Sequence, residues 1–417
     1  MKRSELFTKT LRDAPADETS RNAQLLIRAG FVSKEMAGVY SWLPLGLKVV
    51  EKIKNVVREE MNALGGQELL MSTLQNREIW EKSGRWSDEV VDNWFKTELK
   101  SGETLGLAFT HEEPIVNLAG KYIKSYKDLA KPVAMYQFQN KLRNELRAKS
   151  GVMRGREFVM KDLYSFHKSQ ADLDEYYEKI AAAYMRIFAK LGLGKLTFRT
   201  FASGGSFTKF SDEFQVLCDA GEDWLFVNEA KNVAVNEEVL EDYLRENPEM
   251  KREDFAKKRS AEVGNIFNFG DKKARDMGLN FANENGELVP VFLASYGIGI
   301  TRLVGVIAEI FADEKGLVWP EIVAPATVYL ANLGEETFAK TEEIYNALRE
   351  KNVEVLWDDR DARPGEKFAD AELMGVPRRV VVSRKTLAEN KMEYKLRTSD
   401  ESELLSFDEL LAKFAEK

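Results

Sequence analysis

The chain of 417 residues is 44% hydrophobic and 31% charged, which is typical of a folded chain of about two domains, and no apolar run reaches the roughly 20 residues that span a bilayer. Its 61 basic and 69 acidic residues give a net charge of −8, which argues against a protein that coats nucleic acid with its whole surface. One cysteine and two histidines exclude an internal disulfide framework and disfavour zinc, and they fit the reducing cytoplasm.

Two long helices are predicted in the first half of the chain. Residues 47–64 and 172–191 place apolar side chains at helical spacing, and glycine follows each stretch, as is common where helices end. Between them, residues 133–140 and 156–166 are predicted as strands. The polar, basic loop 143–155 joins these strands, which indicates an antiparallel pair with a long connection.

A glycine-bearing strand at 292–300 is predicted to lead into an apolar helix at 301–311. Before it, the acidic stretch 222–254 has few large apolar residues after its first part, so we expect a solvated surface excursion there. Pro320 and Pro325 interrupt the pattern and indicate a domain boundary.

After that boundary, strands alternate with helices over about 90 residues, which predicts a small α/β domain. The predicted strands are 327–333, 353–357, 378–383 and 393–398, and the predicted helices are 335–350, 365–374 and 406–417. Ser406 and Glu409 form a capping box at the start of the last helix.

Two basic patches, at 141–161 and 378–397, could contact RNA although the whole chain is acidic. Each holds seven basic residues and two acidic ones. The alternative interpretation is that they are the solvated faces of ordinary elements, and neither patch decides this alone.

Arg143 and Glu145 would share one face if they continue the first strand, because strand side chains alternate. A guanidinium beside a carboxylate suits a ligand with an anion and a donor edge, such as a nucleotide. Arg154 and Phe158 add a cation and an aromatic ring. A surface ion pair and a core phenylalanine are the ordinary alternatives.

Two further groups could serve a ligand. Gly297 and Gly299 would let a ligand approach the strand backbone, with Arg302 just beyond, although a close crossing of strand and helix explains glycines equally well. Thr110 and Glu112 could hold an ammonium group, or they could be the acidic first turn of a helix.

The order of these signals resembles the three motifs of class II aminoacyl-tRNA synthetases. Several stretches of the sequence are similar to those of the bacterial-type prolyl-tRNA synthetases. They are THEE at 110–113, GVMRGREFVMKDLYSFH at 151–167, SYGIGITRLVGVI at 295–307 and DDRDARPGEKFADAELMGVPRRVVV at 358–382. The resemblance implies an α+β catalytic domain on an antiparallel sheet, at 1–323, and a small α/β anticodon-binding domain at 324–417. It places motif 1, which builds a homodimer interface in the family, at about 47–72, motif 2 at about 133–167 and motif 3 at about 293–311.

The resemblance also implies an ATP-dependent ligase that joins L-proline to tRNA(Pro) through a prolyl-adenylate. Arg143 would bind the ATP α-phosphate and the substrate carboxylate, and Arg302 would cover adenine and touch the γ-phosphate. The remaining ATP contacts implied by the family are Glu145 to the adenine amino group, Phe158 stacked on adenine, Arg154 on the terminal phosphates, and Gly297 and Gly299 at the backbone.

For the amino acid, Thr110 and Glu112 would grip the proline imino group, and Asp212 and Ser295 would lie near it. Glu213 is a candidate ligand for Mg²⁺, and no zinc is expected. The residues expected to contact tRNA are Arg147 and Lys149 for the acceptor stem and Arg360, Arg363 and Lys367 for the anticodon.

The chain departs from the family pattern at Ser72, Phe109, Asp212, Asn265 and Ser295, where the family usually has Pro, Pro, His, His and Cys. The large editing insertion between motifs 2 and 3 is missing, and only a short acidic segment at about 222–260 stands there. We therefore expect no hydrolysis of alanyl-tRNA by this chain and a separate editing protein in the same cell.

Two other interpretations stay open at this point. The chain could be another class II synthetase, such as a threonyl or seryl enzyme, but the missing zinc ligands count against the threonyl enzyme. It could also be a non-catalytic paralogue, but Arg143, Glu145 and Arg302 are all retained.

Overall fold

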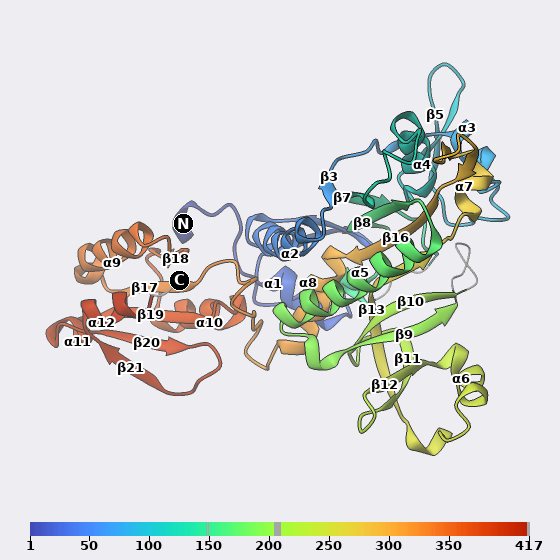
Figure 1. The fold of residues 1–417 in the computed structure, drawn as a ribbon. Helices are drawn as coiled ribbons and strands as arrows, with labels where there is room; N and C mark the ends of the chain where they lie inside the picture. Colours follow the sequence, from blue (N-terminus) through green and yellow to red (C-terminus); the bar gives the residue numbers. More distant parts are fainter. Residues whose placement is uncertain (147, 149, 204–209, 415–417) are drawn as a thin grey trace. The chain divides into compact units, whose positions relative to one another are not determined.

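The computed structural model describes residues 1–146, 148, 150–203 and 210–414. The chain forms two compact units. The first comprises Met1–Glu35, Tyr40–Lys52 and Val304–Lys417, and the second comprises Met36–Val39 and Ile53–Leu303. Figure 1 shows the elements of both units, which are described separately below.

A nine-stranded, largely antiparallel sheet forms the centre of the second unit. Its path runs β12-β11-β13-β16-β8-β7-β3, with β10 paired to β13 and β9 paired to β10. The strands are β3 (Gln67–Glu68), β7 (Val133–Leu142), β8 (Glu157–His167), β9 (Thr197–Ser203), β10 (Phe210–Leu217), β11 (Asp223–Asn228), β12 (Val233–Asn236), β13 (Ala256–Asn268) and β16 (Phe292–Gly299). Among the described strands of this sheet, only β3 pairs in parallel, with β7. The antiparallel pair predicted around the basic loop is β7 with β8.

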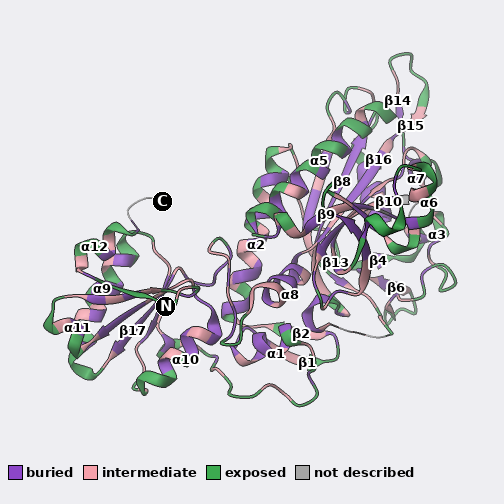
Figure 2. Ribbon diagram, turned by 90° about the horizontal axis from the view of Figure 1, so that it is seen from below, coloured by how far each residue is buried: buried purple, intermediate pink, exposed green. Residues whose placement is uncertain are grey.

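The helix α5 (Gln170–Lys190) packs on β8 and β16. Its buried side chains recur at helical spacing, as the sequence predicts, because an amphipathic helix covers a sheet with its apolar stripe. Ser169 caps its first turn by accepting a hydrogen bond from the Asp172 backbone, and Gly192 follows with a φ of 82°. The strands under this helix are buried (Figure 2).

Smaller elements complete the second unit. A three-stranded sheet is formed by β4 (Leu74–Asn76), β6 (Thr104–Leu107) and β5 (Lys96–Glu98), and β14 (Asn280–Ala282) pairs with β15 (Leu288–Pro290). The remaining α-helices wholly within this unit are α3 (Arg77–Lys82), α4 (Glu112–Tyr122), α6 (Leu240–Glu246) and α7 (Lys272–Met277).

The acidic stretch after residue 222 is folded, so the predicted solvated excursion is wrong. It supplies β11, β12 and α6, and its apolar side chains form a core cluster of their own. The cluster consists of Phe226, Val235, Leu240, Met250 and Phe255. These residues are far apart in the sequence and follow no single period, so no pattern in a short window indicates their contact.

The first unit contains a five-stranded sheet of order β18-β17-β19-β20-β21. Its elements are β17 (Val328–Leu333), α9 (Phe338–Glu350), β18 (Val355–Asp358), α10 (Pro364–Met374), β19 (Arg378–Ser383), α11 (Arg384–Ala388), β20 (Met392–Leu396), β21 (Ser402–Leu405) and α12 (Phe407–Ala412). The predicted strands and helices are present, and the capping box of Ser406 and Glu409 is confirmed. The short β21 and α11 were not predicted.

The same unit holds α1 (Arg21–Arg28), most of β1 (Val32–Met36) and β2 (Val39–Trp42), while α2 (Pro44–Ala63) and α8 (Ile300–Phe311) run from one unit into the other. The fold-class prediction is confirmed: an α+β part on an antiparallel sheet and a small α/β domain. Within the described part of the chain, no helix combines the length and apolar character needed to cross a membrane.

Candidate active site

A cavity of 190 Å³ opens on the central sheet of the second unit. Strands β8, β13 and β16 supply most of its wall, together with the segments that follow β6 and β7. Its lining includes seven of the predicted site residues, namely Thr110, Glu112, Arg143, Phe158, Gly297, Gly299 and Arg302. Ser295, for which we expected a place near the amino acid, also lines it.

A second cavity of 140 Å³ adjoins the first, since both are lined by Arg143, Glu262 and Arg302. It adds the predicted nucleotide residues Glu145 and Arg154. Two guanidinium groups therefore stand where the cavities meet. A ligand that occupies both cavities would place an anionic group between these cations.

Arg143 lies just beyond the end of β7, at the start of the loop predicted for 143–155. The strand ends at Leu142, and the backbone turns because the Glu145 amide donates to the Arg143 carbonyl at 2.8 Å. The Arg143 Cζ lies 5.1 Å from the Phe109 ring centre and 5.2 Å from that of Phe158. Its buried Nε has no hydrogen-bond partner among the described residues. Burial, and then the charge of Arg302, lower the pKa of Arg143.

Arg302 is held more firmly than Arg143. Its Nε donates to the Met153 carbonyl at 2.7 Å and its Nη1 to the Glu262 carbonyl at 2.5 Å. A Cβ on Gly299 would lie only 3.1 Å from the Arg302 Cβ, so glycine here lets the arginine fold back over the strand.

Glu145 and Arg154 form an ion pair at 3.2 Å, and Arg154 also donates to Glu222 at 2.5 Å. Glu222 begins the acidic stretch and directly precedes β11. Glu145 and Arg154, which were predicted to contact opposite ends of ATP, thus pair with each other in this structure. Each would exchange its ion-pair partner for a polar group of the ligand when a nucleotide binds.

Thr110 and Glu112 point at one another, since the threonine Oγ1 donates to the glutamate Oε2 at 2.6 Å. Both side chains are buried, and Arg85 lies 3.7 Å from the same carboxylate oxygen. Glu112 is the first residue of α4, as the helix interpretation of this motif requires. The helix start and the ligand site therefore coincide.

A buried polar network lies directly behind these residues. The Lys141 ammonium is 2.7 Å from His111 Nδ1 and 2.9 Å from an Asp162 carboxylate oxygen, and His111 Nε2 is 3.1 Å from the Ser72 carbonyl. Burial, and then the Lys141 charge, lower the pKa of His111 to about 4. The ring is therefore neutral at pH 7 and accepts from the lysine.

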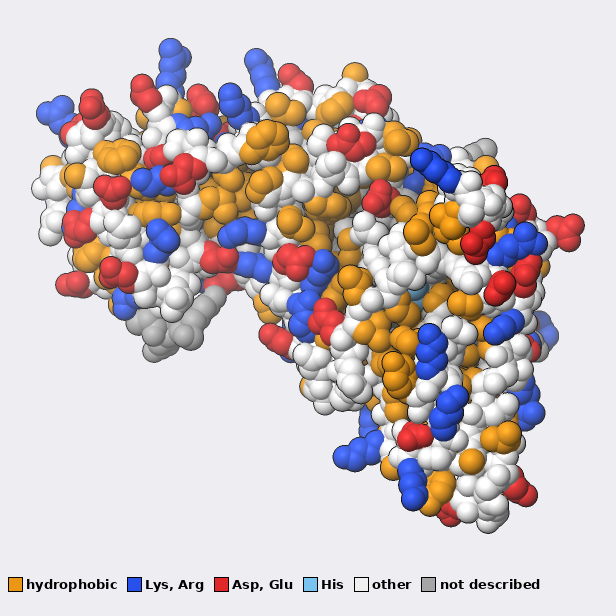
Figure 3. Space-filling model, turned by 90° about the horizontal axis from the view of Figure 1, so that it is seen from above, with side chains coloured by type: hydrophobic (Ala, Val, Ile, Leu, Met, Phe, Trp, Pro, Cys, Tyr) orange, Lys and Arg blue, Asp and Glu red, His pale blue; other side chains and the backbone are white. Residues whose placement is uncertain are grey.

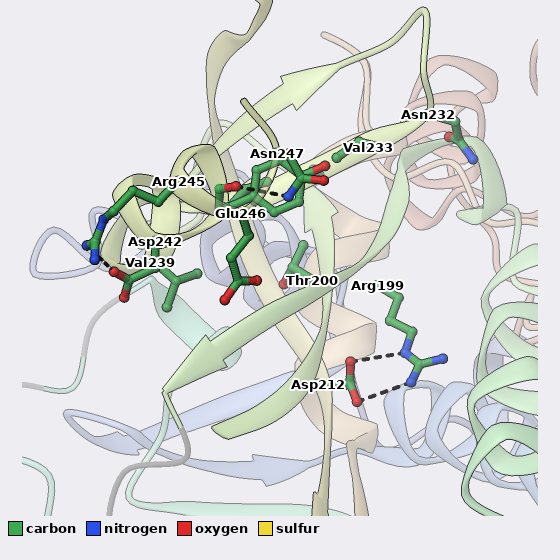
Figure 4. Close-up of a pocket in the computed structure, with 13 residues that line it drawn as sticks. Arg199, Thr200, Asp212, Asn232, Val233, Val239, Asp242, Arg245, Glu246 and Asn247 are labelled. Atoms are coloured by element: carbon green, nitrogen blue, oxygen red, sulfur yellow. Dashed lines mark hydrogen bonds and ion pairs between the residues drawn. The ribbon is translucent and has the colours of Figure 1, made fainter. Parts of the chain in front are cut away.

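Asp212 is not brought to this site. It lines a separate cavity of 760 Å³, where Arg199 lies 3.1 Å away (Figure 4), and it accepts a hydrogen bond from Tyr177 at 2.7 Å. An aspartate committed to these two partners does not face the 190 Å³ cavity, so the structure does not support its predicted contact with proline.

Glu213 lies on β10, and its carboxylate accepts from Gln215 at 2.8 Å. Burial, and then the nearby Glu262 carboxylate, raise the pKa of Glu213 to about 8. A divalent cation would relieve this repulsion. In the described ranges no three His, Cys, Asp or Glu side chains are grouped to hold a metal by themselves. The donors fit an ion that shares its oxygen ligands with a phosphate, as Mg²⁺ does.

Sequence reasoning missed Asp162 and Glu262, which both line the site. The strand period could have found Asp162, because it stands four residues after Phe158 and therefore on the same face of β8. Glu262 could not be found this way, since β13 was not predicted.

The predicted tRNA residues differ in their surroundings. Arg147 and Lys149 lie outside the described residues. Arg363 is exposed, and Arg360 pairs with Asp358 at 2.7 Å. Lys367 is 1% exposed and donates to the carbonyls of Asn332 and Asp358. The prediction that Lys367 contacts RNA directly is therefore wrong.

Comparison with known proteins decides the family. A family model described as the class II tRNA synthetase core domain (G, H, P, S and T) matches residues 95–311, and an anticodon binding domain model matches 327–417. The proline–tRNA ligase of Afipia carboxidovorans is 38% identical over 447 aligned positions, which cover 100% of both chains. The chain belongs to the proline–tRNA ligase family. The ligase of Phenylobacterium zucineum is 39% identical, with 99% of each chain covered.

Solved structures agree on the fold of this family. The prolyl-tRNA synthetase of Giardia lamblia, in complex with prolyl-adenylate, has a TM-score of 0.77 at 21% identity and matches 93% of this chain and 74% of its own. The enzyme of Cryptosporidium parvum, complexed with L-proline and AMP, has a TM-score of 0.75 at 20% identity and matches 94% and 73%.

Proposed function

We propose that this chain ligates L-proline to its cognate tRNA in two steps that consume ATP. The observation that carries the proposal is the pair Arg143 and Arg302 at the boundary of two adjoining cavities. The larger cavity has the Thr110 and Glu112 oxygens for a secondary ammonium group. The smaller cavity has Glu145 and Arg154 for a nucleotide. An α-phosphate bound between them would meet the carboxylate of the amino acid.

In the first step, a proline carboxylate oxygen attacks the α-phosphorus, and the bond to pyrophosphate breaks. In the second, the terminal ribose hydroxyl of tRNA attacks the carbonyl carbon and AMP leaves. Arg143 and Arg302 stabilise the charge that develops at phosphorus, and the cavity walls hold the reactants in line. Neither step requires a nucleophile from the protein.

Mg²⁺ would neutralise the phosphate charge when it arrives with ATP. We propose Glu213 and Glu262 as its protein ligands, because they are neighbouring carboxyl groups and Glu262 lines the nucleotide cavity. Phe158 would stack on adenine where the two cavities meet, since its ring centre lies 5.2 Å from the Cζ of Arg143, which lines both cavities.

The proposed tRNA contacts are Arg360 and Arg363 in the C-terminal domain and Arg147 and Lys149 at the acceptor stem. On the face shown in Figure 3, basic and acidic side chains are interspersed, so no single sign of charge covers that face. We further propose a catalytic part at 1–323, an anticodon-binding part at 324–417, a homodimer through the motif 1 region and a cytoplasmic location.

We propose that the chain does not edit mischarged alanine. Only 137 residues separate Phe158 from Tyr296, and they hold strands of the catalytic sheet as well as the short insertion. Alignments of 447 positions or fewer cover nearly all of each cited relative, so those relatives also have no large insertion. A separate editing protein would then clear alanyl-tRNA.

The test is ATP–pyrophosphate exchange with each of the twenty amino acids. Exchange that depends on proline and exceeds that of every other amino acid is the expected result. Exchange with threonine or serine instead would assign another class II activity. Binding of tRNA without any amino-acid-dependent exchange would identify a non-catalytic paralogue.

A further inference from the structure

Phe109 stands immediately before Thr110, at a position where the family pattern has proline. Its side chain is 5% exposed, and the centre of its ring is 5.1 Å from the Arg143 Cζ. A proline at this position would offer no aromatic face. The phenylalanine therefore gives Arg143 an aromatic neighbour that a proline at this position would not provide.

An aromatic cluster of Trp80, Trp86, Trp94 and Phe109 backs this contact. The ring centres of Trp94 and Phe109 are 6.1 Å apart, and those of Trp80 and Trp94 are 4.4 Å apart. Trp94 is fixed in turn, because its Nε1 donates to the Leu107 carbonyl at 2.6 Å. A Cβ on Gly106 would come within 2.2 Å of the Trp94 ring. Phe109 is thus buried in contact with both Trp94 and Arg143.

The backbone of Arg143 is well anchored, but its guanidinium is not. The Arg143 amide donates to the Arg156 carbonyl at 2.8 Å, and Trp94 forms a β-bridge with it. No described carboxylate forms an ion pair with the guanidinium, and its buried Nε has no acceptor. A ring face holds a guanidinium by cation–π attraction and leaves the N–H edges available for an anion.

We propose that Phe109 is a positioning residue that holds the Arg143 guanidinium ready for the ATP phosphate. Phe158 also touches Arg143, but its ring is assigned to adenine, so Phe109 is the aromatic contact dedicated to the arginine. The inference rests on the proposed function, because it takes the anion to be the ATP α-phosphate.

The experiment compares the binding of ATP and of adenosine by calorimetry on the full chain. Phe109→Leu removes the ring and keeps an apolar side chain. We expect its Kd for ATP to rise about 3- to 30-fold, the range of a cation–π contact, and its Kd for adenosine to stay within about twofold. Phe109→Tyr keeps the ring and should match the unaltered chain for both ligands.

Val91→Ala is the matched control, since Val91 packs in the same apolar cluster and has no aromatic ring to hold a guanidinium. It should leave the ratio of the two affinities unchanged. If Phe109→Leu does not fold, Phe109→Met removes the ring in the same way. ATP binding within twofold in the ring-free variants, an equal loss of both ligands, or the same selective loss in Val91→Ala would each overturn the proposal. Failure of proline-dependent exchange in the unaltered chain would instead refute the proposed function, and the comparison of ATP with adenosine would remain readable.

Discussion

Replacing Arg143 by alanine should lower proline-dependent exchange by more than a hundredfold, because a charged contact to the transition state is worth about 3–4 kcal/mol. The fold should survive, since the buried Nε has no hydrogen-bond partner within the described structure to lose. Arg275→Ala is the control, because this arginine lies on α7 and pairs with Asp271, the residue just before that helix. Exchange by Arg143→Ala within tenfold of the unaltered chain would contradict the assignment.

His111 should make the stability of the fold fall in mild acid. The unfolded chain binds a proton at this residue near pH 6.5, but the folded chain does so only near pH 4, so the contribution is complete above pH 6.5 and is lost as the pH falls toward 4. The His111→Gln variant should lack this part of the pH dependence of the unfolding free energy, which amounts to at most about 3 kcal/mol. Denaturant unfolding at pH 7 and pH 4.5 measures it. If the unfolding free energies of the two proteins differ by the same amount at both pH values, His111 does not titrate in this way.

At the scale of an element, the insertion that begins near residue 222 should behave as a folded unit with its own core. Leu240 is 2% exposed and packs with Phe226 and Val235. Leu240→Ala should therefore cost about 2–5 kcal/mol of local stability, measured by hydrogen exchange of the β12 amides. Glu241→Ala, on the exposed side of the same helix, should change the same amides by less than about 0.5 kcal/mol. Equal protection in both variants would mean that the cluster does not hold the segment together.

For the whole molecule, the proposed lack of an editing domain predicts a defect in accuracy. Alanine is smaller than proline and cannot be excluded by shape, so its rejection depends on lost contacts worth about 1–3 kcal/mol. The chain should activate alanine slowly and leave premade alanyl-tRNA intact over the time in which it charges proline. The assay follows deacylation of alanyl-tRNA with and without the enzyme. Rapid deacylation that depends on the enzyme would reveal an editing site in the short insertion.

Binding of tRNA should weaken steeply with salt although the chain carries a net charge of −8, because local cations release counterions from the phosphates. Arg363→Ala should reduce the affinity and flatten the salt dependence without a change in Tm. Lys367→Met, in contrast, should lower Tm, since the buried ammonium satisfies two backbone carbonyls. A salt-independent affinity would rule out the proposed phosphate contacts.

The sequence by itself determined the elements whose patterns are local. The helical stripe of α5, the strands β7 and β8 and the capping box of α12 each depend on residues within a few positions of one another, and each is present. The family motifs likewise named ten of the residues that line the two cavities, because those motifs are contiguous strings.

Only the tertiary structure decided the contacts between distant segments. Phe109 meets Arg143, Glu222 meets Arg154, and Lys367 is buried beneath Asn332, although nothing near these residues in the sequence indicates such partners. The core of the insertion was missed for the same reason, since its apolar residues come together only when β11, β12 and α6 fold. Periodicity reports which face of one element is apolar, whereas the pairing of faces depends on how the whole chain packs.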